Sequence, residues 1–231
     1  MKRLKITTCR ELRDLIMGIG FIPLFGNEVD GFSVMDISSG RHWWTGSEKA
    51  DPWVWRMILA EDPDIAYGKV FRGRAGFVSK AWFPYFASYR RDGYDFDTRY
   101  EAGKASYRSK RIINLFEKQP LIASYRIRSL AGFSRNGEKG FEGALTLLQM
   151  QTYITVRRFT RKQSKAGEYY GWHIGVYSLS EDKFGHKFMK SAYRLGTEGA
   201  RETLIEQMMK INPGVQYSAA DTFLKLRSSG V

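Results

Sequence analysis

Hydrophobic positions near the start of the chain recur every three or four residues, which predicts a short amphipathic helix. Thr7 or Thr8 can cap this helix and Gly20 can end it. Its apolar face consists of Leu12, Leu15, Ile16 and Ile19. Over residues 23–46 the periodicity is lost among glycines and turn residues, so we expect a loop that is anchored by its aromatic side chains.

A second helix and a hairpin follow this loop. Asp51 and Pro52 fit the N-cap and the first position of a helix. The β-rich runs 65–71 and 75–78 flank a tight turn and predict a β-hairpin. Ser79 can cap the helix that comes next. The three aspartates of residues 90–99 are expected to pair with arginines of the same segment.

Between residues 104 and 177, three helical patterns precede two β-rich runs. We expect helices at 105–117, 124–130 and 139–149, and strands at 152–159 and 169–177. Three helices followed by a two-stranded hairpin is the order of a winged helix-turn-helix. In that motif the third helix enters the DNA major groove and the hairpin tip contacts the backbone. Helical patterns return at 197–211 and 218–227.

These patterns together predict an α+β fold. Residues 100–179 form the winged helix-turn-helix, and residues 180–231 form a helical C-terminal extension. Residues 1–99 form an N-terminal α+β region, where two helices and a hairpin occur in a similar order. A degenerate winged helix, and therefore a tandem arrangement, is one interpretation of this region, although no residue-level repeat is visible.

The net charge of +13 and the sequence pI of about 9.8 favour a polyanionic partner. Residues 104–165 hold fourteen basic and three acidic residues, a net of +11. We expect double-stranded DNA as the partner. The candidate contacts are Arg135 and Lys139 before the third helix, Arg157 and Arg158 in the first strand, and Arg161, Lys162 and Lys165 at the tip of the hairpin. The alternative is an ordinary solvated face or a protein-interaction module.

Composition limits the other functional classes. Cys9 is the single cysteine, which excludes an internal disulfide and a multi-cysteine metal site. No run approaches the roughly 18 apolar residues of a membrane span, so we expect a cytoplasmic protein with no membrane partner. His42, His173 and His186 have no metal-ligand spacing, so neither a metal nor another cofactor is expected.

The junction between the third helix and the first strand carries the most suggestive polar pair. Gln149 and Gln151 flank Met150, and amides donate and accept hydrogen bonds at once. They can hold a water or the edge of a base. Alternatively, they satisfy backbone groups where the helix becomes a strand.

Several short runs carry a resemblance to a known family. They are Ala66–Lys69, Arg72–Ser79, Trp82–Phe86, Arg90–Asp97 and Leu148–Tyr153, within roughly residues 7–195. Together they resemble a bacterial family related to the AlkZ winged-helix DNA glycosylases. The resemblance implies tandem winged helices around DNA. In the enzymes proper, it implies metal-free hydrolysis of the bond between an alkylated purine and its sugar.

In those enzymes a glutamine–hydrophobic–glutamine motif positions the attacking water, and Gln149 and Gln151 match its letters. Their motif lies near the N-terminus and precedes an Arg-Gly-Thr stretch, whereas here it follows Arg72-Gly73-Arg74 by about 75 residues and ends the third predicted helix. The resemblance makes the two glutamines candidate catalytic residues of a monofunctional DNA glycosylase acting in DNA repair. The alternative function is a non-enzymatic winged-helix regulator or scaffold. Its C-terminal helices, with Met208 and Met209, would form a homodimer seam.

Overall fold

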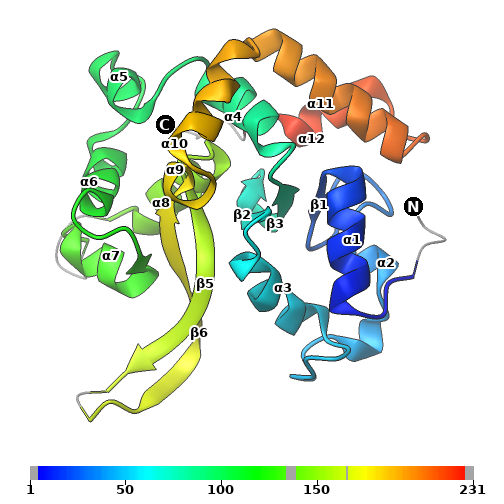
Figure 1. The fold of residues 1–231 in the computed structure, drawn as a ribbon, viewed down its shortest axis with the longest axis horizontal. Helices are drawn as coiled ribbons and strands as arrows, with labels where there is room; N and C mark the ends of the chain where they lie inside the picture. The colour runs from blue at the N-terminus through cyan, green and yellow to red at the C-terminus, as the bar shows by residue number, and fades with distance from the viewer. Residues whose placement is uncertain (1–4, 134–138, 165, 227–231) are drawn as a thin grey trace.

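The computed structural model describes residues 5–133, 139–164 and 166–226. In this part of the chain, helices surround a six-stranded antiparallel sheet with the order β1-β3-β2-β5-β6-β4 (Figure 1). The strands are β1 (Phe21–Pro23), β2 (Ile65–Phe71), β3 (Arg74–Ser79), β4 (Ile122–Ala123), β5 (Ile154–Gln163) and β6 (Tyr169–Leu179). The chain therefore has a mixed α+β fold, as its sequence predicts.

The sheet has the same connectivity on its two sides. The first side runs α1 (Cys9–Ile19), β1, α2 (Val34–Ile37), α3 (Pro52–Glu61), β2 and β3. The second side runs α6 (Tyr107–Phe116), β4, α7 (Ser124–Leu130), α8 (Phe141–Met150), β5 and β6. On each side the short strand after the first helix pairs with the last strand of the hairpin. The order of elements is thus repeated without a visible repeat of residues.

The two sides meet through β2 and β5. The register between these strands contains one pair, Tyr67 opposite Val156, and each residue is the third of its strand. The Thr155 hydroxyl also donates a hydrogen bond to the Tyr67 carbonyl, at 3.0 Å. One hydrogen-bonded sheet therefore joins the N-terminal hairpin to the long C-terminal hairpin, and side chains supplement the short contact between them.

Aromatic packing fills the interior on the first side of the sheet. The rings of Phe21 and Phe86 lie edge to face with their centroids 5.1 Å apart, and Phe71 stacks on Phe223 at 5.3 Å. Gly76 permits the close approach of β1 and β3, because a Cβ atom there would lie 2.6 Å from the Ile22 carbonyl oxygen and from the Pro23 Cα atom of β1. The same Cβ atom would lie 2.5 Å from the Phe71 ring. Large rings and a small residue at the crossing of the strands together produce a dense core.

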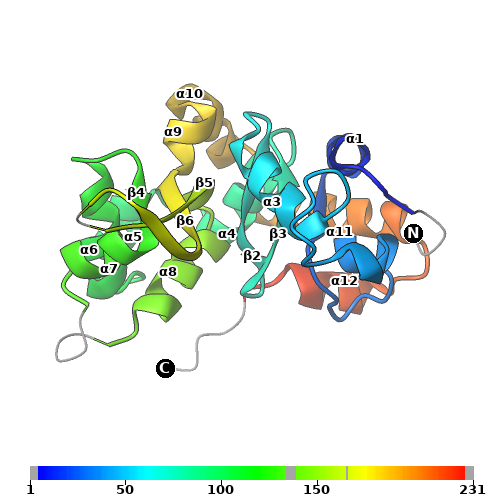
Figure 2. The same cartoon turned by 90° about the horizontal axis from the view of Figure 1, so that it is seen from below.

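The remaining helices connect and cover the two sides. They are η1 (Gly40–His42), α4 (Phe83–Arg91), α5 (Phe96–Glu101), α9 (Ser180–Phe184), α10 (His186–Met189), η2 (Lys190–Arg194), α11 (Thr197–Ile211) and α12 (Tyr217–Leu224). Helix α11 lies along α4, and α12 lies beside α11 (Figures 1 and 2). Since Phe223 of α12 contacts Phe32 and Phe71, the C-terminal helices pack on the first side of the chain.

Local sequence signals located most of these elements correctly. Thr8 caps α1 in a reciprocal capping box with Glu11, and Asp51 caps α3 with Pro52 in its first turn. The predicted hairpin over 65–78 is formed by β2 and β3. The expected helices and strands of residues 104–177 are all present, with bounds shifted by a few residues.

Three local predictions were wrong. Ser79 ends strand β3 and caps no helix, because the chain makes a further turn before α4 begins at Phe83. Residues 23–46 contain the short helix α2, which Ser33 caps. The aspartates of residues 90–99 do not form ion pairs with Arg90 or Arg91, whose side chains are buried. Asp92 and Asp97 pair instead with Lys104 and Lys110.

Candidate functional site

The hairpin of β5 and β6 extends away from the helices (Figure 1). Its ladder runs from the pair Ile154 and Leu179 out to Gln163 and Tyr169. The structure therefore places Arg161 and Lys162 within β5 and not at the tip of the hairpin, where the sequence predicts them. The two strands can stay paired where they extend into solvent, because their outer side chains are polar and need not be buried. Lys165 lies outside the described residues.

Cations without acidic partners line the outer part of this hairpin. Arg158, Arg161 and Lys162 are exposed, and no ion pair to them occurs in the described chain. Glu168 is the one acidic residue in the sequence of residues 154–179. Arg157 is half-buried, and its guanidinium donates to the backbone carbonyl of Asp182 at 3.3 Å. The outer strand thus presents positive charge, whereas Arg157 faces helix α9.

Large aromatic side chains stand beside these cations on β6. Tyr169 and Tyr170 are exposed, and Trp172 exposes 89% of its surface. Tyr170 lies opposite Lys162, and a register shift near Gly171, whose φ is 75°, interrupts the ladder before Trp172. The contacts predicted from the sequence do not include these aromatics. The sequence does indicate their exposure, because large rings at adjacent positions of a strand cannot all face one core.

Other predicted contacts are distributed differently. Lys139 is exposed and lies two residues before α8, while Arg135 falls outside the described residues. Three further cations of residues 104–165 have acidic neighbours. They pair as Lys104 with Asp92, Lys110 with Asp97, and Arg128 with Glu142. The basic segment is therefore partly neutralised, and its unpaired part includes the hairpin.

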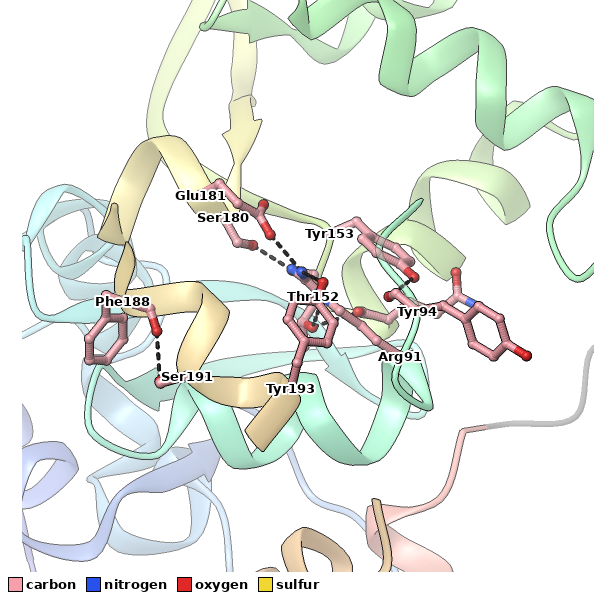
Figure 3. Close-up of polar contacts among 10 residues, drawn as sticks. Arg91, Tyr94, Thr152, Tyr153, Ser180, Glu181, Phe188, Ser191 and Tyr193 are labelled. Atoms are coloured by element: carbon pink, nitrogen blue, oxygen red, sulfur yellow. Dashed lines mark hydrogen bonds and ion pairs between the residues drawn. The ribbon is translucent and has the colours of Figure 1, made fainter. Parts of the chain in front are cut away.

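A buried arginine anchors the base of the hairpin (Figure 3). Arg91 of α4 forms an ion pair with Glu181 of α9 at 2.5 Å and donates to the Thr152 carbonyl at 2.7 Å. Thr152 has a φ of 64°, and its carbonyl also accepts from Ser180 at 2.6 Å. The Tyr193 hydroxyl accepts from Arg91 as well, at 3.0 Å. These bonds fix both ends of the hairpin relative to α4.

The two glutamines of the α8–β5 junction are buried, with Gln149 exposing 2% and Gln151 5% of their surfaces. The Gln149 Oε1 atom accepts from the backbone N–H of Lys69 at 3.0 Å, and its Nε2 donates to the Leu145 carbonyl at 3.0 Å. Lys69 lies beyond the single pair that joins β2 to β5. Gln149 therefore supplies the acceptor that β5 does not offer there.

A cavity of about 210 Å³ lies where β2 and β5 diverge. Its walls include Trp53, Arg56, Tyr67, Gln149, Phe159 and Tyr177. Gln151 is not among the lining residues, so the structure does not bring the two glutamines to one cavity. Of the tryptophans in the first quarter of the chain, Trp53 reaches this cavity, whereas Trp43 and Trp55 are in the core.

The charges around this cavity give it a positive electrostatic potential. His173 also lines it, and partial burial with the nearby charges of Arg161 and Arg56 lowers the pKa of that imidazole. Burial raises the pKa of the Tyr67 phenol to about 12, so the phenol stays protonated at neutral pH. No Asp or Glu belongs to the described lining of the cavity. The cavity thus offers hydrogen-bond donors to a ligand.

Among the described residues, no helix has the length and apolar character needed to cross a membrane. No group of three His, Cys, Asp or Glu side chains among them is arranged to hold a metal ion.

Comparison with known proteins places the chain in a family. The AlkZ-related family matches residues 6–225, which is nearly the whole sequence. Neither the curated proteins nor the solved structures contain a significant match. The family match extends the similarity seen in short sequence runs through both hairpins and into α12. The chain therefore belongs to the AlkZ-related family.

Proposed function

We propose that this protein binds double-stranded DNA through the β5–β6 hairpin. The observation that carries the proposal is the juxtaposition of unpaired cations on β5 with exposed aromatics on β6. Long cationic side chains reach phosphate oxygens without entering a core. Membership of a family related to DNA-acting AlkZ proteins favours the same partner.

The connectivity supports a tandem winged-helix arrangement as the scaffold. In each half a helix, a short strand, two helices and a hairpin follow in order, and the short strand pairs with the second strand of the hairpin. A winged helix has this order of three helices and a wing. On this proposal α8 is the third helix of the second unit, and β5–β6 is its wing.

The charges and rings of the hairpin have separate roles in this account. Arg158, Arg161 and Lys162 contact phosphates, and these contacts set affinity without reading sequence. Trp172 contacts a base or wedges into the minor groove, because a ring that is 89% exposed has little packing to lose. Binding is consequently salt-sensitive and tolerant of sequence.

A second candidate function is hydrolysis of an N-glycosidic bond, with Gln149 and Gln151 as the catalytic residues. It is favoured by the position of Gln149 on a cavity wall that also carries Arg56 and Tyr67. A spare lone pair on Gln149 Oε1 and a spare proton on Nε2 are available to orient a water in that cavity. Gln151 does not line the cavity, so its role would require another approach of the substrate.

Incubation with duplex DNA that carries N3- or N7-alkylpurines separates the two functions. Base release is measured together with the affinity for the same duplex and for its unmodified control. Binding to both duplexes without release supports the DNA-binding function, and with it a non-enzymatic regulator, and removes the glycosylase. Release that is lost in Gln149→Met, although circular dichroism shows that this variant is folded at the assay temperature, but kept in Gln119→Met establishes the enzyme. No binding to either duplex contradicts both functions.

A further inference from the structure

Arg56 of α3 is a buried cation on the wall of the cavity between β2 and β5. Its surface is 4% exposed, and its guanidinium lies between two rings, 3.5 Å from the Trp53 centroid and 4.5 Å from the Phe159 centroid. These contacts stabilise the positive charge. They do not satisfy its donors, because Nη1 has no hydrogen-bond partner in the described chain.

Asp51, the acidic residue whose charge acts on Arg56, does not neutralise it. Asp51 is fully buried, and its carboxylate accepts from the backbone N–H groups of Gly46 at 2.9 Å and Trp53 at 2.8 Å. Its charge acts on Arg56 at a distance, and no ion pair forms between their side chains in the described chain. A buried guanidinium without a paired anion carries a desolvation cost that a ligand can offset.

Other donors face the same cavity. The hydroxyls of Tyr67 and Tyr177 form no hydrogen bonds with described residues, and both residues line the cavity. The charge of Arg56 acts on Tyr67, and Tyr67 in turn acts on Tyr177. The other polar residues of the lining are Lys69, whose Nζ atom also lies 3.5 Å from the Thr146 hydroxyl, His173 and the amide of Gln149. Because donors predominate and carboxylates are absent from the described lining, the complementary ligand is an acceptor with negative charge.

We propose that this cavity binds a phosphate monoester, with Arg56 as its charged ligand and the hydroxyls of Tyr67 and Tyr177 as additional donors. The site is distinct from the hairpin surface proposed to contact DNA, and its ligand is a small molecule or a strand end.

The charge balance favours phosphate over a carboxylate or a neutral base. Arg56 and Lys69 line the cavity, and Arg161 is close enough to lower the pKa of His173. Several cations suit a group that carries close to two negative charges and three acceptor oxygens, whereas one cation suffices for a carboxylate. The volume of about 210 Å³ suits a small group and is below the usual range for drug-sized ligands.

Calorimetric titration of the full chain tests the proposal with four probes. They are inorganic phosphate, 2′-deoxyadenosine 5′-monophosphate, 2′-deoxyadenosine and acetate. We expect both phosphate compounds to bind, and the nucleoside and acetate to bind at least about tenfold more weakly, the loss expected for removing a charged hydrogen bond. Tighter binding of the nucleotide than of phosphate shows that the nucleoside part of the monoester is also recognised, and equal affinities show that the phosphate group alone is recognised. Equal binding of nucleoside and nucleotide overturns the proposal.

Two variants assign the site to this cavity. Arg56→Met removes the guanidinium and keeps an unbranched apolar side chain at this position, and we expect phosphate affinity to fall about tenfold to a hundredfold. Arg10→Met, at an exposed arginine of α1, should leave phosphate affinity unchanged. Tyr177→Phe removes one donor and should weaken binding by a smaller factor. Wild-type affinity in both Arg56→Met and Tyr177→Phe overturns the proposal.

Discussion

Gln149 and Lys69 are eighty positions apart in sequence, yet the Oε1 atom of the glutamine accepts a hydrogen bond from the lysine backbone N–H at 3.0 Å. The bond continues the contact between β2 and β5 beyond their one paired position. It also holds α8 against β2. The family resemblance makes Gln149 a candidate catalytic residue. In the structure it satisfies a backbone group, which is the alternative role that the sequence also allows.

Replacing this acceptor is expected to destabilise the fold. Gln149→Met leaves the Lys69 N–H without its partner, which costs about 1–3 kcal/mol of unfolding free energy. Urea denaturation measures the change, and Gln119→Met, at an exposed glutamine after α6, is the matched control. The control should change by less than about 0.5 kcal/mol. Equal stability of the two variants would show that the bond is not important.

The anchor at the base of the hairpin makes a second prediction. Arg91→Met leaves Glu181 and the Thr152 carbonyl without their cation, and the loss of unfolding free energy should be about 3–5 kcal/mol. Arg126→Met changes an exposed arginine of α7 and should be nearly neutral. Thermal unfolding of both variants checks this. An unchanged midpoint for Arg91→Met would contradict the role assigned to the network in Figure 3.

Lys183 predicts a pH dependence. Burial, together with the charge of Arg157, lowers the pKa of Lys183 from 10.5 to about 8. Between these two values the unfolded chain binds more protons than the folded chain, so this lysine makes the unfolding free energy rise with pH. The difference between wild type and Lys183→Met should therefore grow in favour of wild type from about pH 8 to 10.5. The control is Lys187→Met, at an exposed lysine. If the stability difference between wild type and Lys183→Met stayed constant with pH, as it should for the control, the shifted pKa of Lys183 would be contradicted.

Trp172 should contribute to DNA affinity but not to stability. Because it is 89% exposed, Trp172→Ala should change the unfolding free energy by less than about 0.5 kcal/mol. Its contact with a base should be worth about 1–3 kcal/mol of binding free energy. Fluorescence anisotropy with labelled duplex DNA measures the loss, and Trp44→Ala, at another exposed tryptophan, is the control. Equal affinities for the two variants would remove Trp172 from the interface.

The elements that follow from the sequence are those whose signals are local. The capping box of Thr8 and Glu11, and Asp51 before Pro52, lie within one helical turn of the residues they organise. Strands β1 and β4 were not predicted, because each has at most three residues and pairs with distant partners. Phe21 lies opposite Val78, and Ile122 lies opposite Tyr177.

The candidate site was predicted only in part for the same physical reason. The sequence alone shows that the hairpin is rich in cations, and the structure exposes three of them, Arg158, Arg161 and Lys162. Their freedom from acidic partners depends on packing, as the paired Lys104 and Lys110 illustrate. Met208, which was assigned to a dimer seam, is buried within this chain, so it cannot also form that seam.

The salt dependence of DNA binding tests the central proposal most directly. For wild type the logarithm of the binding constant should fall linearly with the logarithm of salt concentration. In Arg161→Gln/Lys162→Gln the slope should be smaller by about two, because two phosphate contacts are lost. Lys104→Gln/Lys110→Gln, where both cations are already paired, should keep the wild-type slope. A hairpin variant with the wild-type affinity and slope would contradict DNA binding through β5–β6.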